Sequence, residues 1–127
     1  MALRSLTPML QTSDMERTVA WYQQTLDFRC VRRLGNDWCQ LERDGVSLMF
    51  MQNAHVGAPH ATATQYIRVD DVDALWDSLK NRVPAEWGPQ LMPYGMREFA
   101  IKDPDGYYLS FGAPVALAGE QGDKLLS

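Results

Sequence analysis

The sequence has few cysteines, no long apolar run and no excess of positive charge, and each absence excludes a class of protein. Two cysteines among 127 residues are too few for a disulfide-stapled secreted scaffold, so a reducing cytoplasm is the expected compartment. No apolar run reaches the roughly 18 residues of a membrane-spanning helix, and the first residues lack the apolar segment of a signal peptide. With 12 Lys and Arg against 16 Asp and Glu, the net charge is −4, which argues against nucleic acid as a partner.

The sequence motifs of several common catalytic sites are missing too. Neither G-x-S-x-G, nor a phosphate-binding P-loop, nor G-x-G-x-x-G occurs. His55 and His60 have no third donor near them in the sequence, so we interpret them as solvated loop residues and not as metal ligands. Cys30 and Cys39 fall on neighbouring predicted strands without a C-x-x-C spacing, which favours small core residues over a redox pair.

What the sequence does contain is an internal repeat. The pattern D-G-x-x-L-x-F occurs at 44–50 and again at 105–111. Upstream, residues 7–14 resemble residues 64–71. Two collinear matches indicate duplication of a structural unit. The downstream pair is slightly farther apart than the upstream pair, and a longer loop in the second copy would absorb the difference.

Each copy predicts a strand, a helix and further strands. Apolar and polar residues alternate at about 3–12 and 62–69, and apolar residues at helical spacing follow both segments. The strands expected after the helices are 28–33, 37–42, 46–52, 97–102 and 107–111. Between the second helix and residue 97, repeated Pro and Gly make the stretch irregular, so the strand expected there is poorly defined.

Polar residues mark the predicted helix starts and turns. Ser13 with Glu16 three residues later is typical of a capping box, and Asp70 or Asp71 is expected to open the second helix. Asn and Asp next to Gly, at 35–36 and 44–45, predict tight turns. The acidic clusters at 70–73 and 103–105 are interpreted as helix caps and turns and not as a catalytic carboxylate pair.

The predicted fold is therefore α+β, with two βαβββ modules forming a cup-shaped mixed sheet that has its helices on the outer face. We expect a single domain over 1–127: module one at about 3–52, a linker at 53–61, module two at about 62–113 and a tail at 114–127. Each module is too small to bury its own sheet face. The modules are therefore expected to pack together, within one chain or between the chains of a homodimer.

The segment 94–106, which reads YGMREFAIKDPDG, is the most specific of the chain. A doubled βαβββ unit with D-P-D-G before its last strand resembles the vicinal oxygen chelate superfamily, which includes glyoxalase I, fosfomycin-resistance proteins, extradiol dioxygenases and bleomycin-resistance proteins. The resemblance covers about Leu6 to Gly112, and the 94–106 segment is most similar to the bleomycin-resistance branch.

The resemblance also implies where a metal would be held. In the metal-dependent members, the first and fourth strands of each module supply the ligands, usually His or Gln, Glu, His and Glu. The matching positions of this chain are Thr7, Met49, Thr64 and Ser110. Because a divalent ion needs imidazole or carboxylate donors, we expect neither a metal nor another cofactor.

Alternation of side chains along the strands then predicts what lines the cup. The expected ligand-binding residues on the strands are Thr7, Met9, Gln11, Trp38, Met49, Met51, Thr64, Tyr66, Arg68, Tyr108 and Ser110. Trp87 and Tyr94 are expected to cover the mouth of the cup. Arg97 is a further candidate, although a bulge near D-P-D-G leaves the facing of its strand open.

These residues favour a metal-free protein that sequesters a planar aromatic small molecule, cationic or neutral, as the bleomycin-resistance resemblance implies. The alternative is an enzyme of the same superfamily, a lyase, isomerase or transferase acting on a small hydrophobic substrate with a displaced metal or none. Its polar catalyst would be Arg68, Arg97 or Glu98. A purely structural or regulatory module is a third possibility. For each of these we expect a homodimer, with or without exchange of strands, and no membrane partner.

Overall fold

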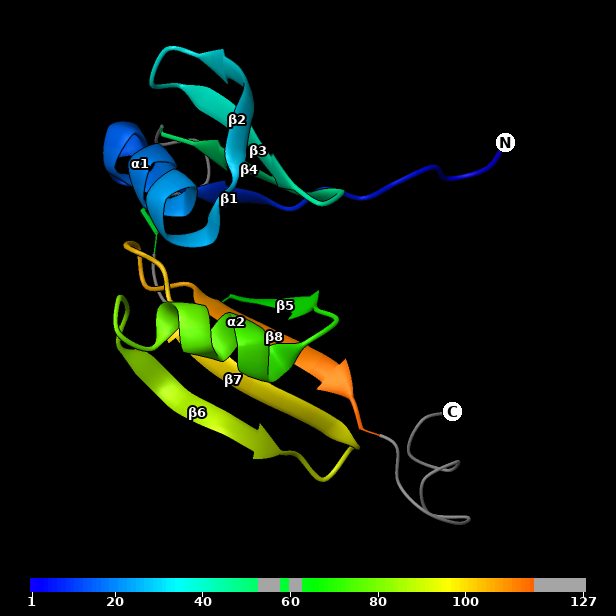
Figure 1. Cartoon of the computed structure of the whole chain (residues 1–127). Coiled ribbons are helices and arrows are strands. Elements are labelled where there is room, and N and C mark those ends of the chain that lie inside the picture. Colours follow the sequence, from blue (N-terminus) through cyan, green and yellow to red (C-terminus); the bar gives the residue numbers. More distant parts are fainter. Residues whose placement is uncertain (53–57, 60–62, 116–127) are drawn as a thin grey trace. The chain divides into compact units, whose positions relative to one another are not determined.

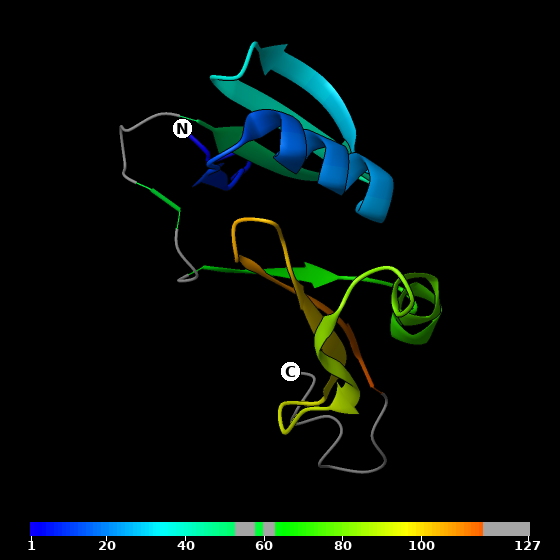
Figure 2. The same cartoon turned by 90° about the vertical axis from the view of Figure 1, so that its left-hand side faces the viewer.

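The computed structural model describes residues 1–52, 58–59 and 63–115. The chain divides into two compact units, Met1–Ala61 with Pro104–Gly106, and Thr62–Asp103 with Tyr107–Ser127. Each unit has one four-stranded mixed sheet and one helix that covers one face of that sheet (Figures 1 and 2). The predicted α+β fold of two βαβββ modules is confirmed.

The two modules have the same order of elements. Module one consists of β1 (Met9–Gln11), α1 (Met15–Leu26), β2 (Arg29–Leu34), β3 (Trp38–Arg43) and β4 (Val46–Met51). Module two consists of β5 (Thr64–Arg68), α2 (Val72–Leu79), β6 (Ala85–Leu91), β7 (Met96–Lys102) and β8 (Tyr108–Pro114). The strand orders are β1-β4-β3-β2 and β5-β8-β7-β6, and in each sheet the first strand pairs parallel with the last.

The register of the two sheets reproduces the sequence repeat. Met9 lies opposite Met49 in module one, and Tyr66 lies opposite Ser110 in module two. Met9 and Tyr66 occupy the same position in the upstream part of the repeat, and Met49 and Ser110 occupy the same position in the downstream part. The duplication inferred from the sequence therefore extends to the hydrogen-bonding register.

The core of each module lies between its helix and its sheet. In α1 the predicted apolar stripe is buried, with Met15, Val19, Tyr22 and Leu26 at most 5% exposed. The Tyr22 ring contacts Phe50 at a centroid distance of 5.1 Å. Complete burial of each such side chain stabilises the fold by roughly 1.5–3 kcal/mol.

Aromatic rings form the equivalent core of module two. Phe99 contacts Trp76 of α2 at 5.3 Å and Phe111 of β8 at 5.2 Å between ring centroids. Phe111 corresponds to Phe50 in the repeat, and both are buried. Equivalent positions thus fill the two cores.

The first strand begins later than predicted. Alternation indicates a strand from about residue 3, but β1 begins at Met9, and Leu3 and Leu6 are exposed. Pro8, which precedes the strand, has no N–H to donate to a neighbouring strand. Its carbonyl accepts a hydrogen bond from Met49 N at 2.9 Å. Alternation shows which side chains would share a face of a strand. It does not show where a neighbouring strand is present to form the backbone hydrogen bonds.

The stretch predicted to be irregular contains the edge strand β6. It pairs with β7 through two register shifts, between Ala85 and Trp87 and between Trp87 and Gln90. An edge strand needs hydrogen bonds on one side only, so it tolerates Pro89 within its span. The sequence predicts a poorly defined strand in this stretch, and β6 is a strand with irregular pairing.

The helix caps and turns follow the sequence closely, with one correction. The N-cap of α1 is Asp14, which accepts from Arg17 N at 3.1 Å, and not Ser13. Asp71 caps α2 by accepting from Ala74 N at 3.0 Å. Residues 44 and 45 both have positive φ, at 50° and 80°, as a two-residue hairpin turn requires.

Parts of the predicted linker and tail lie outside the described residues, as do His55 and His60. Pro114, which the sequence assigns to the tail, is the last residue of β8. In the part of the chain that the structure describes, no helix is long and apolar enough to cross a membrane.

Candidate functional site

The predicted methionine and tryptophan side chains lie on the helix-free face of module one, the sheet face opposite α1. Met51 is the register partner of Gln11 in β1 and of Trp38 in β3. Met49 shares that face and lies opposite Met9. These side chains are therefore brought together by β1, β3 and β4.

The other side chains of β4 confirm this facing. Leu48 and Phe50 alternate with Met49 and Met51, and both are buried on the side of α1. On the helix-free face, Gln40 Nε2 donates to Ser47 Oγ at 2.9 Å. Thioethers and one indole thus share this face with a few polar groups, a composition typical of small-molecule sites.

The helix-free face of module two has a different chemistry. The rows of side chains across β5, β8 and β7 are Thr64–Tyr108–Lys102, Tyr66–Ser110–Ala100 and Arg68–Gly112–Glu98. β6 adds Trp87 opposite Ala100 and Gln90 opposite Glu98. Phenols and charged groups therefore take the place of the thioethers.

A buried carboxylate is the centre of this second face. Glu98 is only 2% exposed, and its Oε1 accepts a hydrogen bond from the Tyr66 hydroxyl at 3.2 Å. The Tyr94 hydroxyl also donates to Oε1. Tyr94 reaches it from the turn between β6 and β7, which Gly95 closes with a φ of 82°.

Glu98 raises the pKa of both phenols above their ordinary value. The hydrogen bond to Glu98, together with the negative charge of that carboxylate, raises the pKa of Tyr94 to about 12. Partial burial and the charge of Glu98 raise the pKa of Tyr66 as well, and Arg68 opposes this shift. Both hydroxyls are therefore neutral donors over the physiological range.

Gly112 is what allows Tyr66 to reach Glu98. A Cβ atom on residue 112 would lie 2.1 Å from the Tyr66 hydroxyl oxygen and 2.8 Å from the ring carbon next to it. The phenol thus lies across the backbone of β8 at a position without a side chain. A larger residue would displace it.

A group of aromatic rings lies beside this cluster on the same face. The rings of Trp87 and Tyr108 contact edge to face at 6.1 Å, and Lys102 Nζ lies 5.3 Å from the Tyr108 centroid. Trp87 Nε1 is buried without a hydrogen-bond partner among the residues that the structure describes. Trp87 is thus a residue of strand β6, and its ring packs against Tyr108 on the helix-free face.

Arg97 is a predicted ligand-binding residue of module two, but it does not lie on the helix-free face of that module. It lies on the side of α2, where its guanidinium donates to both carboxylate oxygens of Asp73 at 2.8 and 3.0 Å. The open question about this strand is thereby answered: Glu98, and not Arg97, faces away from α2.

The predicted set of ligand-binding residues did not contain Glu98, although the sequence has a signal for it. In β7, Phe99 and Ile101 are apolar and alternate with Glu98, Ala100 and Lys102. Assigning the apolar residues to the helix side places Glu98 on the other face. The contact with Tyr94 has no such signal, because it depends on how the β6–β7 turn folds.

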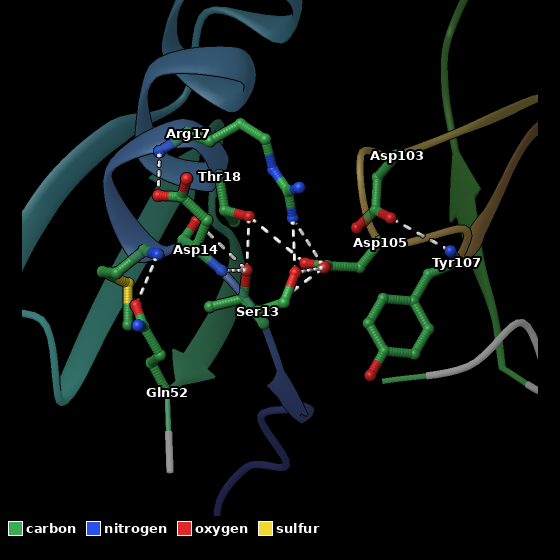
Figure 3. Close-up of polar contacts among 10 residues, drawn as sticks. Ser13, Asp14, Arg17, Thr18, Gln52, Asp103, Asp105 and Tyr107 are labelled. Carbon is green, nitrogen blue, oxygen red and sulfur yellow. Dashed lines mark hydrogen bonds and ion pairs between the residues drawn. The ribbon is translucent and has the colours of Figure 1, made fainter. Parts of the chain in front are cut away.

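In the acidic clusters, Asp71 caps α2 and Asp103 stabilises its turn, as predicted, whereas Asp73 and Asp105 pair with Arg97 and Arg17. The Asp105 side chain is 1% exposed and accepts from Ser13 N, Ser13 Oγ and Thr18 Oγ1, and it pairs with Arg17 at 2.6 Å (Figure 3). Burial alone would raise the pKa of Asp105, but hydrogen bonds from Thr12 and Ser13 and the Arg17 charge outweigh it and lower the pKa. The 104–106 turn is thus held to the first turn of α1.

Asp103 stabilises the same turn from within. Its Oδ1 accepts from Tyr107 N at 3.0 Å (Figure 3). Its backbone N–H donates to Tyr107 O at 2.9 Å. The two aspartates of D-P-D-G therefore have different partners, one inside the turn and one on α1.

The four positions that the resemblance implies for metal ligands do not fit a metal. Met49 and Ser110 lie on the helix-free faces, Thr64 is in β5, and Thr7 precedes β1. None supplies an imidazole or a carboxylate. Among the described residues, no three His, Cys, Asp or Glu side chains are grouped closely enough to hold an ion.

Of the two cysteines, only Cys39 occupies a core position, whereas Cys30 is half-buried. Both are free thiols, and Cys39 is fully buried. Burial raises the pKa of the Cys39 thiol to about 11, so its nucleophilic thiolate form is scarce.

The fold, the doubled register and the D-P-D-G turn define a class that comparison with known proteins identifies. Residues 4–111 match the Glyoxalase/Bleomycin resistance protein/Dioxygenase superfamily. The chain belongs to this superfamily.

Several solved structures are similar over nearly the whole chain. A bleomycin resistance determinant encoded on the transposon Tn5 is 25% identical, with a TM-score of 0.73 over 88% of this chain and 98% of that one. A bleomycin-binding protein from Streptomyces verticillus, in complex with copper(II)-bleomycin, is 24% identical, with a TM-score of 0.73 over 94% and 99%. A glyoxalase/bleomycin resistance protein/dioxygenase from Nocardioides is 18% identical, with a TM-score of 0.77 over 94% and 89%. Comparison with curated protein sequences finds no match.

Proposed function

We propose that the protein binds and sequesters a planar aromatic small molecule, cationic or neutral, without a metal. The proposal rests on the side chains of the helix-free faces. Module one has thioethers and an indole on this face, and module two has phenols. Flat rings stack on aromatic side chains, and methionines adapt to their outline. Similarity to a bleomycin resistance determinant supports a ligand of this kind.

The two helix-free faces offer a ligand different contacts. On module one, Met9, Met49, Met51 and Trp38 would contact apolar parts of a ligand. On module two, Tyr66 and Tyr108 would provide stacking surfaces. An aromatic contact contributes roughly 0.5–1.5 kcal/mol beyond its buried area, so two or three of them support micromolar affinity together with apolar burial.

Tryptophan fluorescence tests this proposal. Trp38 and Trp87 lie on the two helix-free faces, so a bound aromatic compound should change their emission. We expect saturable binding for bleomycin or another member of a panel of planar compounds, and no stoichiometric metal by elemental analysis of untagged protein. The absence of any binding compound, or a stoichiometric divalent ion, would overturn the proposal.

An enzyme of the superfamily is the second candidate, and Glu98 is the observation that favours it. A carboxylate between two protonated phenols can accept a proton or orient a polar substrate group. Mass spectrometry of the bound compound after prolonged incubation distinguishes the two functions. Unchanged compound supports sequestration, whereas multiple turnovers that Glu98→Gln abolishes establish the enzyme.

We also propose that the protein is a homodimer in the cytoplasm. Both sheets have edge strands, which present backbone groups that another chain can pair with, and Leu34 of the edge strand β2 is exposed. The free thiols of Cys30 and Cys39 fit a reducing compartment. Light scattering at micromolar concentration should report about twice the mass of one chain, and a monomer at high concentration would contradict this.

A further inference from the structure

Among the residues that the structure describes, no cation lies at ion-pair distance from the Glu98 carboxylate. The cations near it on β7 are engaged elsewhere, with Arg97 paired to Asp73 and Lys102 to Glu86. Arg68 lies two strands away across Gly112, roughly 10 Å between the backbones. Glu98 is thus held by neutral groups alone in this part of the chain.

An unpaired carboxylate at this depth is costly unless something compensates it. Burial removes the carboxylate from water, and hydrogen bonds from neutral donors recover only part of the lost hydration. Tyr66 and Tyr94 are such neutral donors, because both phenols hold their protons. The charge of the carboxylate therefore remains available to a cation.

One oxygen of Glu98 is free to take such a cation. Both tyrosine hydroxyls donate to Oε1, and a carboxylate has two oxygens with about four acceptor positions. Oε2 accepts no hydrogen bond from the described residues. It is nevertheless not one of their fully buried polar atoms without a partner, because Trp87 Nε1 is the only such side-chain atom. Oε2 therefore keeps some exposed surface, although Glu98 as a whole is only 2% exposed, and it is the acceptor to which a ligand group can be directed.

The two phenols also form a suitable border for a cation. Tyr66 is 44% exposed and Tyr94 is 48% exposed, although both hydroxyls are directed at Glu98. Their rings thus present surface to solvent beside the carboxylate. Aromatic rings next to a carboxylate are a favourable environment for an ammonium or amidinium group, which combines ion pairing with attraction to the ring faces.

We propose that Glu98, bordered by Tyr66 and Tyr94, binds a protonated nitrogen of the ligand, as an ammonium or amidinium group. This inference rests on the proposed function and narrows its ligand class to planar aromatic cations. The aromatic part of the ligand contacts the tyrosine rings, and its cationic group pairs with Oε2. Module two thereby selects the charge of the ligand.

Two probes with the same ring system test the charge selection. Isothermal titration calorimetry at about 0.15 M salt, where surface charges are largely screened, compares 2-naphthylmethylammonium with neutral 2-naphthylmethanol. We expect the unaltered protein to bind the ammonium compound about tenfold more tightly. This comparison needs no variant, so it holds even if a Glu98 variant fails to fold.

Glu98→Gln should then remove the preference, so that the ammonium compound binds no more tightly than 2-naphthylmethanol to this variant. Asp77→Asn is the matched control, because it makes the same change of charge at an exposed position of α2. It should keep the tenfold preference.

The outcomes separate this proposal from the proposed function. Equal affinity for both probes in the unaltered protein, or a preference that survives in Glu98→Gln, overturns the cation site and leaves aromatic binding in place. Binding of neither probe also overturns the cation site. The proposed function falls as well only if no member of the wider panel binds.

Discussion

Module one and module two pair their first and last strands in the same register, yet they place different side chains on it. Where module one has Met9 opposite Met49, module two has Tyr66 opposite Ser110. Trp38 lies opposite Met51, and the equivalent pairing in module two is Glu98 opposite Gly112. Duplication thus conserved the backbone pairing and the core, while the helix-free faces became apolar in one copy and polar in the other.

The difference teaches that the two faces of each sheet are under different constraints. The helix side must fill a closed volume, so Phe50 and Phe111 remain equivalent. The helix-free side admits polar groups as well, so an indole and a carboxylate occupy matching positions. We expect stability to respond symmetrically to changes in the two cores, and binding to respond asymmetrically to changes on the two faces.

The largest expected effect is on the cores. Phe50→Ala and Phe111→Ala should each lower the free energy of unfolding by about 3–5 kcal/mol, because each leaves a cavity under a helix. Urea denaturation followed by circular dichroism measures this. Leu6→Ala, at an exposed position, is the control and should cost less than about 0.5 kcal/mol. A small loss for only one of the two phenylalanines would break the symmetry of the cores.

The two repeat-equivalent aspartates should differ. Asp105→Asn should cost about 2 kcal/mol at neutral pH, because Asp105 is buried and accepts several hydrogen bonds as a carboxylate. Asp44→Asn should change stability by less than about 0.5 kcal/mol, since Asp44 is 85% exposed. Equal losses in urea denaturation would contradict the asymmetry.

The Asp105 contribution should also depend on pH. Its pKa in the folded protein lies below its ordinary value, so its stabilisation is complete above the unfolded value of about 3.9. The stabilisation is lost as the pH falls from there through the folded pKa. The difference between the unaltered protein and Asp105→Asn should therefore narrow below about pH 4, and a constant difference would argue against an ionised Asp105.

The two helix-free faces should contribute to binding in different ways. Trp38→Ala and Tyr66→Ala should each weaken binding of 2-naphthylmethanol about tenfold, or about 1.4 kcal/mol, because each removes an aromatic contact. Glu98→Gln, at the position equivalent to Trp38, should weaken binding of this neutral probe less than either alanine variant does, because it removes a charge and no aromatic ring. If both alanine variants fail to fold, these rings belong to the core and not to a binding surface.

The smallest expected effect concerns the position of one phenol. Gly112→Ala should displace Tyr66 from Glu98, because the new Cβ would overlap its hydroxyl. The pKa of Tyr66 should then fall toward the ordinary value of 10.0, which absorbance titration of the phenols measures. Gly88→Ala is the control, since its Cβ would meet Trp76 at an ordinary distance of 3.6 Å. An unchanged titration in Gly112→Ala would contradict the position of Tyr66.

Much of the architecture could be predicted from the sequence because its signals are local. The 44–45 turn needs two residues that tolerate positive φ, and Asp-Gly provides them. The apolar stripe of α1 and the alternation of β4 depend only on spacing along the chain. Because the two copies of the repeat correspond residue by residue, an assignment made in one module could also be made at the equivalent position of the other.

The remaining features depended on groups that are distant in sequence. Ser13 has the pattern of a helix cap, but its hydroxyl donates to Asp105, 92 residues away, and Asp14 caps the helix instead. β6 contains a proline that argues against a strand, and only its place at the sheet edge makes the proline acceptable.

The sequence by itself therefore determined the two modules, their cores and the residues of module one that share a face. Only the tertiary structure decided that Tyr66 and Tyr94 meet at the Glu98 carboxylate, and that Arg97 pairs with Asp73 of α2. The physical reason is that side-chain spacing is set within a strand, whereas hydrogen-bonding register and turn conformation are set between strands. A site built across three strands and a turn exists only once that pairing has formed.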